Sequence, residues 1–177
     1  ETGQNSSNGQ IVDDCHQQIT DAFQLLCCGW ILSSRVKLWE ANMNSPNWNS
    51  NQHISGFTRD ISTLRYLVQN IPSAKSKLYF FEGAYRLICG SNPLETQLFF
   101  ERTLRKRRIN GGNNIICTAE DNNTASFSDK EDFANALLLS SKYLPSQCFS
   151  CPAEREGYLK EGIAIIERYQ IQNKVVL

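Results

Sequence analysis

The sequence lacks the features that most directly reveal a function. It contains no recognisable nucleophile motif, metal-binding motif or phosphate-binding loop. No apolar run approaches the roughly 20 residues of a membrane-spanning helix, and no signal peptide is visible. The net charge is zero, with 18 basic and 18 acidic residues, which argues against nucleic-acid binding driven by the charge of the whole domain. We therefore expect no enzyme activity, cofactor, metal, nucleic-acid partner or direct membrane insertion.

The composition that is present is typical of one globular domain. The chain has 177 residues, of which 41% are hydrophobic and 20% charged, so it can bury one sizeable core. Residues 1–3 are interpreted as a remnant of an expression vector for secretion, and we expect residues 1–12 to be disordered. Residues 13–177 are predicted to form a single helical domain.

The periodicity of apolar residues predicts an all-α fold. Apolar side chains recur at three- and four-residue steps, and no segment favours a strand. The first helix is apolar on nearly every side between Ala22 and Leu32, which predicts a central, buried position that includes Trp30 and Trp39. Gly90 is predicted to end the third helix, and Asn92 is a predicted cap before Pro93. The expected helices cover about 13–40, 53–69, 73–89, 93–108, 128–143 and 152–170, with a mobile loop at 109–127.

Short connections predict that these helices stack as antiparallel hairpins. The pair at 73–108 resembles a tetratricopeptide-type repeat, because bulky and small residues alternate at the expected spacings. Thr stands where Ala is usual, and the closing proline is missing, so we expect a repeat-like stack rather than a specific repeat family. The residues at those spacings are Phe80, Ala84, Leu87, Thr96, Phe100, Thr103 and Leu104.

Seven cysteines form an odd set, whereas a secreted disulfide framework favours an even one. Cys27, Cys28 and Cys89 lie in apolar helical phrases, where cysteine is commonly a small buried hydrophobe. We therefore expect a reducing native compartment. The Cys148-x-x-Cys151 pair at a helix start leaves a redox or metal role open, although no strands flank it and other ligands are scattered. The structural interpretation of this pair is favoured.

Three groups of residues are candidates for binding a partner. The basic run that ends the fourth helix is either a complement to the helix dipole or an anion-facing surface. The acidic residues of the last two helices form either a solvated face or a docking face for a basic partner. Trp48 lies in a polar loop, as an interface anchor or tucked onto the body. The candidates are Trp48, Arg105, Arg107, Arg108, Asp129, Glu131, Asp132, Glu154, Glu156 and Glu161.

Several phrases resemble one known family, the C-terminal regulatory domain of sterol regulatory element-binding proteins. The resemblance covers most of 23–108 and again 133–169. Each phrase is weak alone, and their order and spacing carry the resemblance. The phrases are L-L-C-C-G-W-I-L-S-S-R-V-K-L-W (25–39), G-F-T-R-D-I-S-T-L-R (56–65), R-L-I-C-G (86–90), L-R-K-R-R (104–108) and A-N-A-L-L-L-S-S-K-Y-L-P (134–145).

The resemblance implies a non-catalytic interaction domain of a membrane-bound transcription-factor precursor. Such a domain lies on the cytosolic side of the endoplasmic reticulum membrane and binds the WD40 propeller of the escort protein Scap. Scap carries the precursor to the Golgi when sterols are low, and proteolysis there frees the transcription factor. The family's domain is usually longer on its N-terminal side, so we expect a fragment. A secreted helical signalling protein, which the sequons at Asn5 and Asn122 would suit, and a thiol redox protein are the alternatives.

Overall fold

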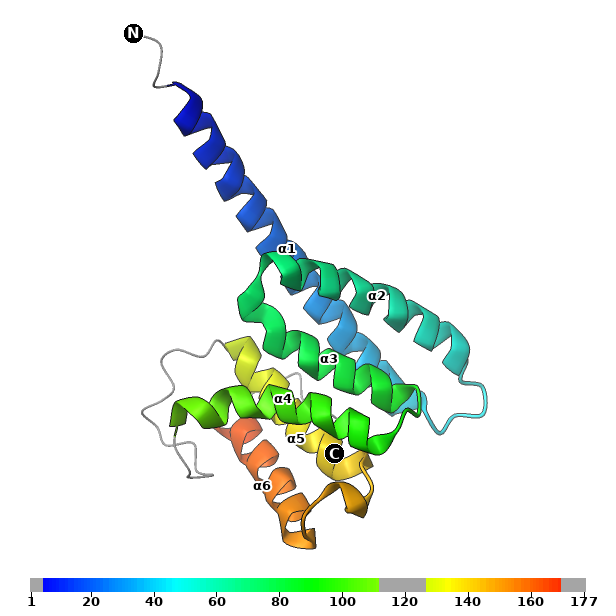
Figure 1. Cartoon of the computed structure of the whole chain (residues 1–177). Helices are drawn as coiled ribbons and strands as arrows, with labels where there is room; N and C mark the ends of the chain where they lie inside the picture. The colour runs from blue at the N-terminus through cyan, green and yellow to red at the C-terminus, as the bar shows by residue number, and fades with distance from the viewer. Residues whose placement is uncertain (1–4, 112–126, 170–177) are drawn as a thin grey trace.

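The computed structural model describes the backbone of residues 5–111 and 127–169, with side chains placed in 16–104 and 130–169. Figure 1 shows an all-helical arrangement, which confirms the predicted fold class. Six α-helices pack against one another in this part of the chain. The closest packing joins α1 to α2, α3 to α4, and α5 to α6. The α-helices are α1 (Asn5–Asn42), α2 (Ser50–Asn70), α3 (Lys75–Ile88), α4 (Pro93–Gly111), α5 (Phe127–Tyr143) and α6 (Pro152–Tyr169).

Three helix boundaries differ from the sequence-based expectation by three residues or more. Helix α2 begins at Ser50, where the expected start was about 53. Helix α1 begins at Asn5, inside the lead that was predicted to be disordered. Helix α4 continues to Gly111, so the first residues of the predicted loop are helical, while 112–126 lie outside the described residues. Each residue added to an existing helix gains one backbone hydrogen bond, so a helix can extend beyond its apolar pattern.

The short connection between α3 and α4 forms as its sequence predicts. Gly90 adopts a positive φ of 65°, and the amide of Ser91 donates to the carbonyl of Arg86 at 2.9 Å. Glycine favours this left-handed conformation, which ends a helix by satisfying its last carbonyls. The side chain of Asn92 accepts a hydrogen bond from the amide of Leu94 at 2.9 Å, which confirms the predicted cap of α4. The turn between α3 and α4 is therefore determined locally.

The expected central position of α1 is wrong for one of its two faces. Its inner face is buried, with Leu32 and Val36 in the core and Trp39 against the ring of Tyr143 at 4.9 Å. Its outer face carries Trp30, which is 66% exposed and not part of the core as predicted. The main packing partners of α1 in the described part of the chain are α2 and α3, and they bury the inner face.

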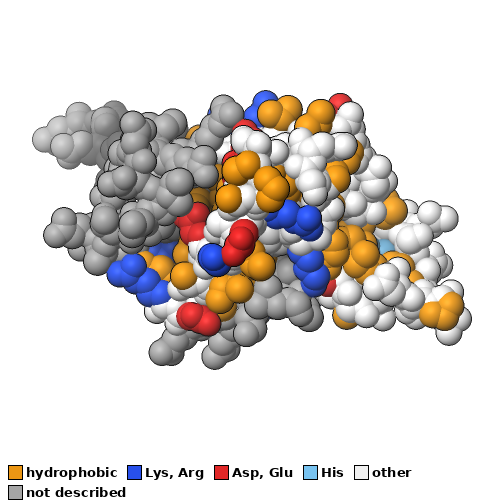
Figure 2. All heavy atoms as spheres, turned by 90° about the horizontal axis from the view of Figure 1, so that it is seen from below, with side chains coloured by type: hydrophobic (Ala, Val, Ile, Leu, Met, Phe, Trp, Pro, Cys, Tyr) orange, Lys and Arg blue, Asp and Glu red, His pale blue; other side chains and the backbone are white. Residues whose placement is uncertain are grey.

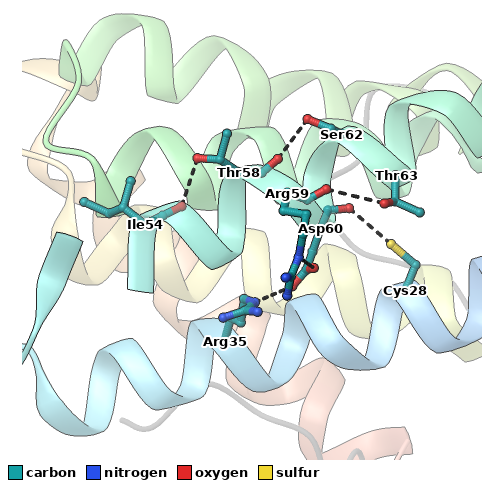
Figure 3. Close-up of polar contacts among 8 residues, drawn as sticks. All are labelled: Cys28, Arg35, Ile54, Thr58, Arg59, Asp60, Ser62 and Thr63. Carbon is teal, nitrogen blue, oxygen red and sulfur yellow. Dashed lines mark hydrogen bonds and ion pairs between the residues drawn. The ribbon is translucent and has the colours of Figure 1, made fainter. Parts of the chain in front are cut away.

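Residues of the recognisable phrases join α1 to α2 (Figure 3). Arg35 forms an ion pair with Asp60, and both side chains are largely buried. A Cβ atom at Gly56 would lie 2.8 Å from the guanidinium carbon of Arg35, so the glycine makes room for that guanidinium. The thiol of Cys28 donates to the carbonyl of Asp60 at 3.4 Å. The R-V-K-L-W and G-F-T-R-D phrases therefore meet in one contact.

Side-chain contacts also join α2 to α3 and α3 to α4. The Arg65 guanidinium of α2 donates to Glu82 of α3 at 2.6 Å, and Glu82 is buried. A Cβ atom at Gly83 would lie 2.8 Å from the ring of Phe100 in α4, and that ring is 1% exposed. Each consecutive pair of helices from α1 to α4 is thus joined by a specific side-chain contact.

The seven residues at the repeat-like spacings lie where the pattern places them. Phe80, Ala84, Thr96, Phe100, Thr103 and Leu104 are buried, and Leu87 packs against the core. The Thr103 hydroxyl donates to the carbonyl of Phe99 at 3.3 Å, which satisfies a buried polar group inside its own helix. Threonine can therefore replace the alanine that such repeats usually have.

Candidate protein-docking surface

Two arginines and two aromatic rings gather on the surface formed by α3 and α4. The guanidinium carbon of Arg86 lies 4.7 Å from the ring centroid of Phe99. That of Arg102 lies 5.3 Å from the same ring and 5.6 Å from the ring of Tyr79. We call these four residues the arginine–aromatic surface. Because Phe99 and Arg102 are one helical turn apart on α4, the short α3–α4 turn brings Tyr79 and Arg86 beside them.

The arginine–aromatic surface presents guanidinium groups that stack on aromatic rings. Planar guanidinium groups stack on aromatic rings and keep their edge donors available for carboxylates. Arg102 is exposed, whereas Arg86 is one-third exposed and pairs with Glu95 at 2.9 Å. The Nε of Arg86 is buried and makes no hydrogen bond within the described part of the molecule. Arg102 is therefore the guanidinium best placed to meet another protein.

Charges on the face of the molecule seen from below are mixed rather than of one sign. Figure 2, which views the molecule from below, shows single basic and acidic side chains among hydrophobic ones. The basic run of the sequence continues α4 beyond Arg102, but the side chains of Arg105, Arg107 and Arg108 lie outside the described residues. Arg102 is therefore the only residue of this basic run whose side chain the structure describes.

The acidic candidates of α5 are largely enclosed. Asp132 is buried and accepts a hydrogen bond from Lys77 Nζ at 2.6 Å, so its charge joins α5 to α3. Glu131 is half-buried, and its Oε1 has no hydrogen-bond partner in the described part of the chain. Burial raises the pKa of Glu131, and the neighbouring Asp132 raises it further. The Asp129 side chain lies outside the described residues. Asp132 offers no exposed carboxylate to a partner.

The acidic candidates of α6 have three different environments. A carboxylate oxygen of Glu154 accepts a hydrogen bond from the backbone amide of Ser150 at 2.7 Å, beside the start of the helix. Glu156 is exposed and pairs with Lys160 at 2.6 Å, and the hydrogen bond from Lys160 lowers its pKa. Glu161 is half-buried. The predicted acidic face is therefore divided, and Glu156 is its exposed member.

Trp48 packs onto the body of the protein instead of projecting from its loop. Its ring centroid lies 4.8 Å from the ring of His53, and the side chain is half-buried. His53 is 5% exposed, and its Nε2 makes no hydrogen bond to any described residue. Burial lowers the pKa of His53, and the positive charge of Arg35 lowers it further. Trp48 therefore shields a neutral histidine from water.

The buried thiols of Cys28 and Cys148 do not have the environment of a reactive cysteine. Cys27, Cys28, Cys89, Cys148 and Cys151 are free thiols. Burial raises the pKa of the Cys148 thiol and raises that of Cys28 to about 11, whereas a nucleophile needs a lowered value. Across 16–104 and 130–169, no three His, Cys, Asp or Glu side chains gather in a way that could hold a metal ion.

Comparison with known proteins adds no assignment. No protein-family model matches the chain, and no solved structure matches it. None of the helices in the described ranges has the length and apolar character needed to cross a membrane. The relation to sterol regulatory element-binding proteins therefore depends on the phrases alone.

Sequence reasoning named none of the four residues of the arginine–aromatic surface as partner-binding, although Arg102 belongs to the basic run that ends the fourth helix. Tyr79, Arg86 and Phe99 were assigned no role, because each looks ordinary within its own helix. The three-residue spacing of Phe99 and Arg102 could have indicated that these two side chains lie next to each other on one helix. Recognising the full surface also required the register between α3 and α4.

Proposed function

We propose that this chain is a non-catalytic protein-docking domain that binds the WD40 propeller of the escort protein Scap. It would belong to the C-terminal regulatory domain of a sterol regulatory element-binding protein. The arginine–aromatic surface is the observation that supports docking, and the ordered phrases at 25–39, 56–65, 86–90, 104–108 and 134–145 support the choice of partner.

The chemistry of the surface suits a protein partner. Arginine and aromatic residues are enriched among the residues that dominate interface energies. Stacking reduces the freedom that Arg102 must lose on binding, because its guanidinium is already held over two rings. The partner must offer a carboxylate that can accept two parallel hydrogen bonds from this guanidinium.

The rigid scaffold also fits this role. The Arg35–Asp60 and Arg65–Glu82 pairs and the Gly83 contact join the helices that support the surface. In the proposed context, the domain lies on the cytosolic side of the endoplasmic reticulum membrane. Docking would let Scap carry the whole precursor to the Golgi for proteolytic activation.

Binding of purified propeller to two matched variants tests the proposal. Arg102→Ala removes the exposed guanidinium, and we expect the dissociation constant to rise by a factor of about 10 to 30, as for an interface hot spot. Lys160→Ala is the control, because Lys160 is an exposed cation on α6 whose surface ion pair contributes little to stability. Alanine favours a helix in both cases.

The comparison has clear outcomes. Weaker binding of Arg102→Ala with unchanged binding of Lys160→Ala supports docking through the α3–α4 surface. Equal binding by the wild type and both variants would place the contact elsewhere. No binding of the wild type at concentrations of tens of micromolar would contradict the proposal for this chain.

A further inference from the structure

A stripe of large apolar side chains faces water on the outer side of α1. Ile19, Phe23, Leu26 and Trp30 are 64%, 67%, 52% and 66% exposed. We call these four residues the outer stripe. Their spacing of four, three and four residues places them on one line along the helix, opposite the buried Cys28, Leu32 and Val36. No described residue covers the outer stripe.

The outer stripe has the pattern of a helix-pairing seam. A four–three–four spacing of apolar residues is the a/d pattern by which two helices pack their side chains together. Thr20, Ala22 and Cys27 beside the stripe are small and uncharged, and His16 lies one turn before Ile19. Asp21, the acidic residue nearest to it, is 7% exposed and is hydrogen-bonded to Gln17 and Asn70. The surface thus offers shape and apolar area without charge.

We propose that the outer stripe pairs with the outer stripe of a second copy of this chain, antiparallel and with two-fold symmetry. A symmetric interface places a surface against itself, so exposed like charges would repel each other, and residues 17–33 expose no charged side chain. Centring the pair between Phe23 and Leu26 brings each Phe23 opposite Leu26 of the other copy. Each Ile19 then faces Trp30. Every contact matches a large aromatic ring with a smaller aliphatic side chain, as interdigitated packing requires.

The apolar area of the outer stripe suits a weak, reversible dimer, because it is smaller than the area that each partner buries in a standard interface. Two aromatic and two aliphatic side chains, each more than half exposed, offer on the order of 500 Å² of apolar surface. A standard interface takes about 800 Å² from each partner. Ile31 and Leu38, each 49% exposed, are further apolar side chains of α1 that lie outside the stripe. The N-terminal half of α1 projects from the helical body, so antiparallel pairing keeps the two bodies apart (Figure 1).

Sedimentation equilibrium of the full chain over a range of concentrations tests the pairing. We expect the wild type to show a monomer–dimer equilibrium at micromolar concentrations. Phe23→Glu places two carboxylates in the seam and should weaken the dimer at least about tenfold. Gln24→Glu introduces the same charge at an exposed position of α1 outside the stripe and should leave the equilibrium unchanged.

Circular dichroism establishes that both variants keep the helical fold. A wild type that stays monomeric at a protein concentration of about 100 µM overturns the proposal, because weak interfaces are detected at such concentrations. A dimer that tolerates Phe23→Glu, or one that Gln24→Glu weakens equally, also overturns it. If the wild type is monomeric and floats with phosphatidylcholine vesicles, the stripe binds lipid and the pairing is refuted.

Discussion

Replacing Gly83 by alanine tests the contact that joins α3 to α4. Gly83 lies inside α3, and a Cβ atom there would stand 2.8 Å from two atoms of the Phe100 ring. The ring is 1% exposed and also packs near Phe80, with a centroid distance of 6.4 Å, so it has little room to move. We expect an overpacking cost of about 1–3 kcal/mol.

Alanine also favours a helix more than glycine does, and a control must remove this effect. Gly157 lies inside α6, and a Cβ atom there would have no neighbour within 4 Å. Gly157→Ala should therefore stabilise the protein by about 1 kcal/mol. The difference between the two variants isolates the contact with Phe100, because the helix preference contributes to both.

Urea unfolding followed by circular dichroism measures this difference. We expect the unfolding free energy of Gly83→Ala to be about 1–3 kcal/mol lower than that of Gly157→Ala. Phe100→Leu in the Gly83→Ala background should recover part of the loss, since the smaller side chain leaves space. Equal stabilisation by the two alanines would refute the close packing of α3 on α4.

Two further predictions concern charge. In a double-mutant cycle, Arg35→Met and Asp60→Asn should each destabilise the protein. Their coupling energy, measured by urea unfolding, should be about 1.5–3 kcal/mol, as for a hydrogen bond to a charged group. A coupling energy near zero would contradict the ion pair between α1 and α2. Burial lowers the pKa of His53, so the unfolded chain binds the proton more tightly than the folded protein does. The stability that the neutral His53 side chain contributes should therefore be fully present above about pH 6.5 and should fall as the pH decreases below this value. His53→Gln should flatten this dependence between about pH 7 and pH 5, and an unchanged slope would contradict the neutral, shielded histidine.

The sequence was sufficient to predict the helices and most of the core. Apolar spacing, Asn92 and Gly90 act within a few residues, so their effects could be read directly. The Arg35–Asp60 and Lys77–Asp132 pairs join residues far apart in the chain. Their existence depends on helix register, which periodicity alone does not determine.

Two errors have a common physical cause. The first helix, apolar on nearly every side, was expected to be surrounded by other helices, and this assumption placed Trp30 in the core. Acidic residues off the apolar stripes were expected to lie exposed, on a solvated face or a docking face, but Lys77 of α3 reaches Asp132 and allows it to be buried. In both cases the number and placement of neighbouring helices decided the outcome. The same reasoning explains why the arginine–aromatic surface was not foreseen.

Hydrogen–deuterium exchange with and without saturating WD40 propeller is the most direct test of docking through the α3–α4 surface. It reports where backbone amides become protected across the whole chain. We expect added protection in segments 79–86 and 99–104, around the arginine–aromatic surface, with α1 unchanged. Unchanged exchange throughout, or protection confined to α1 or α6, would contradict the account.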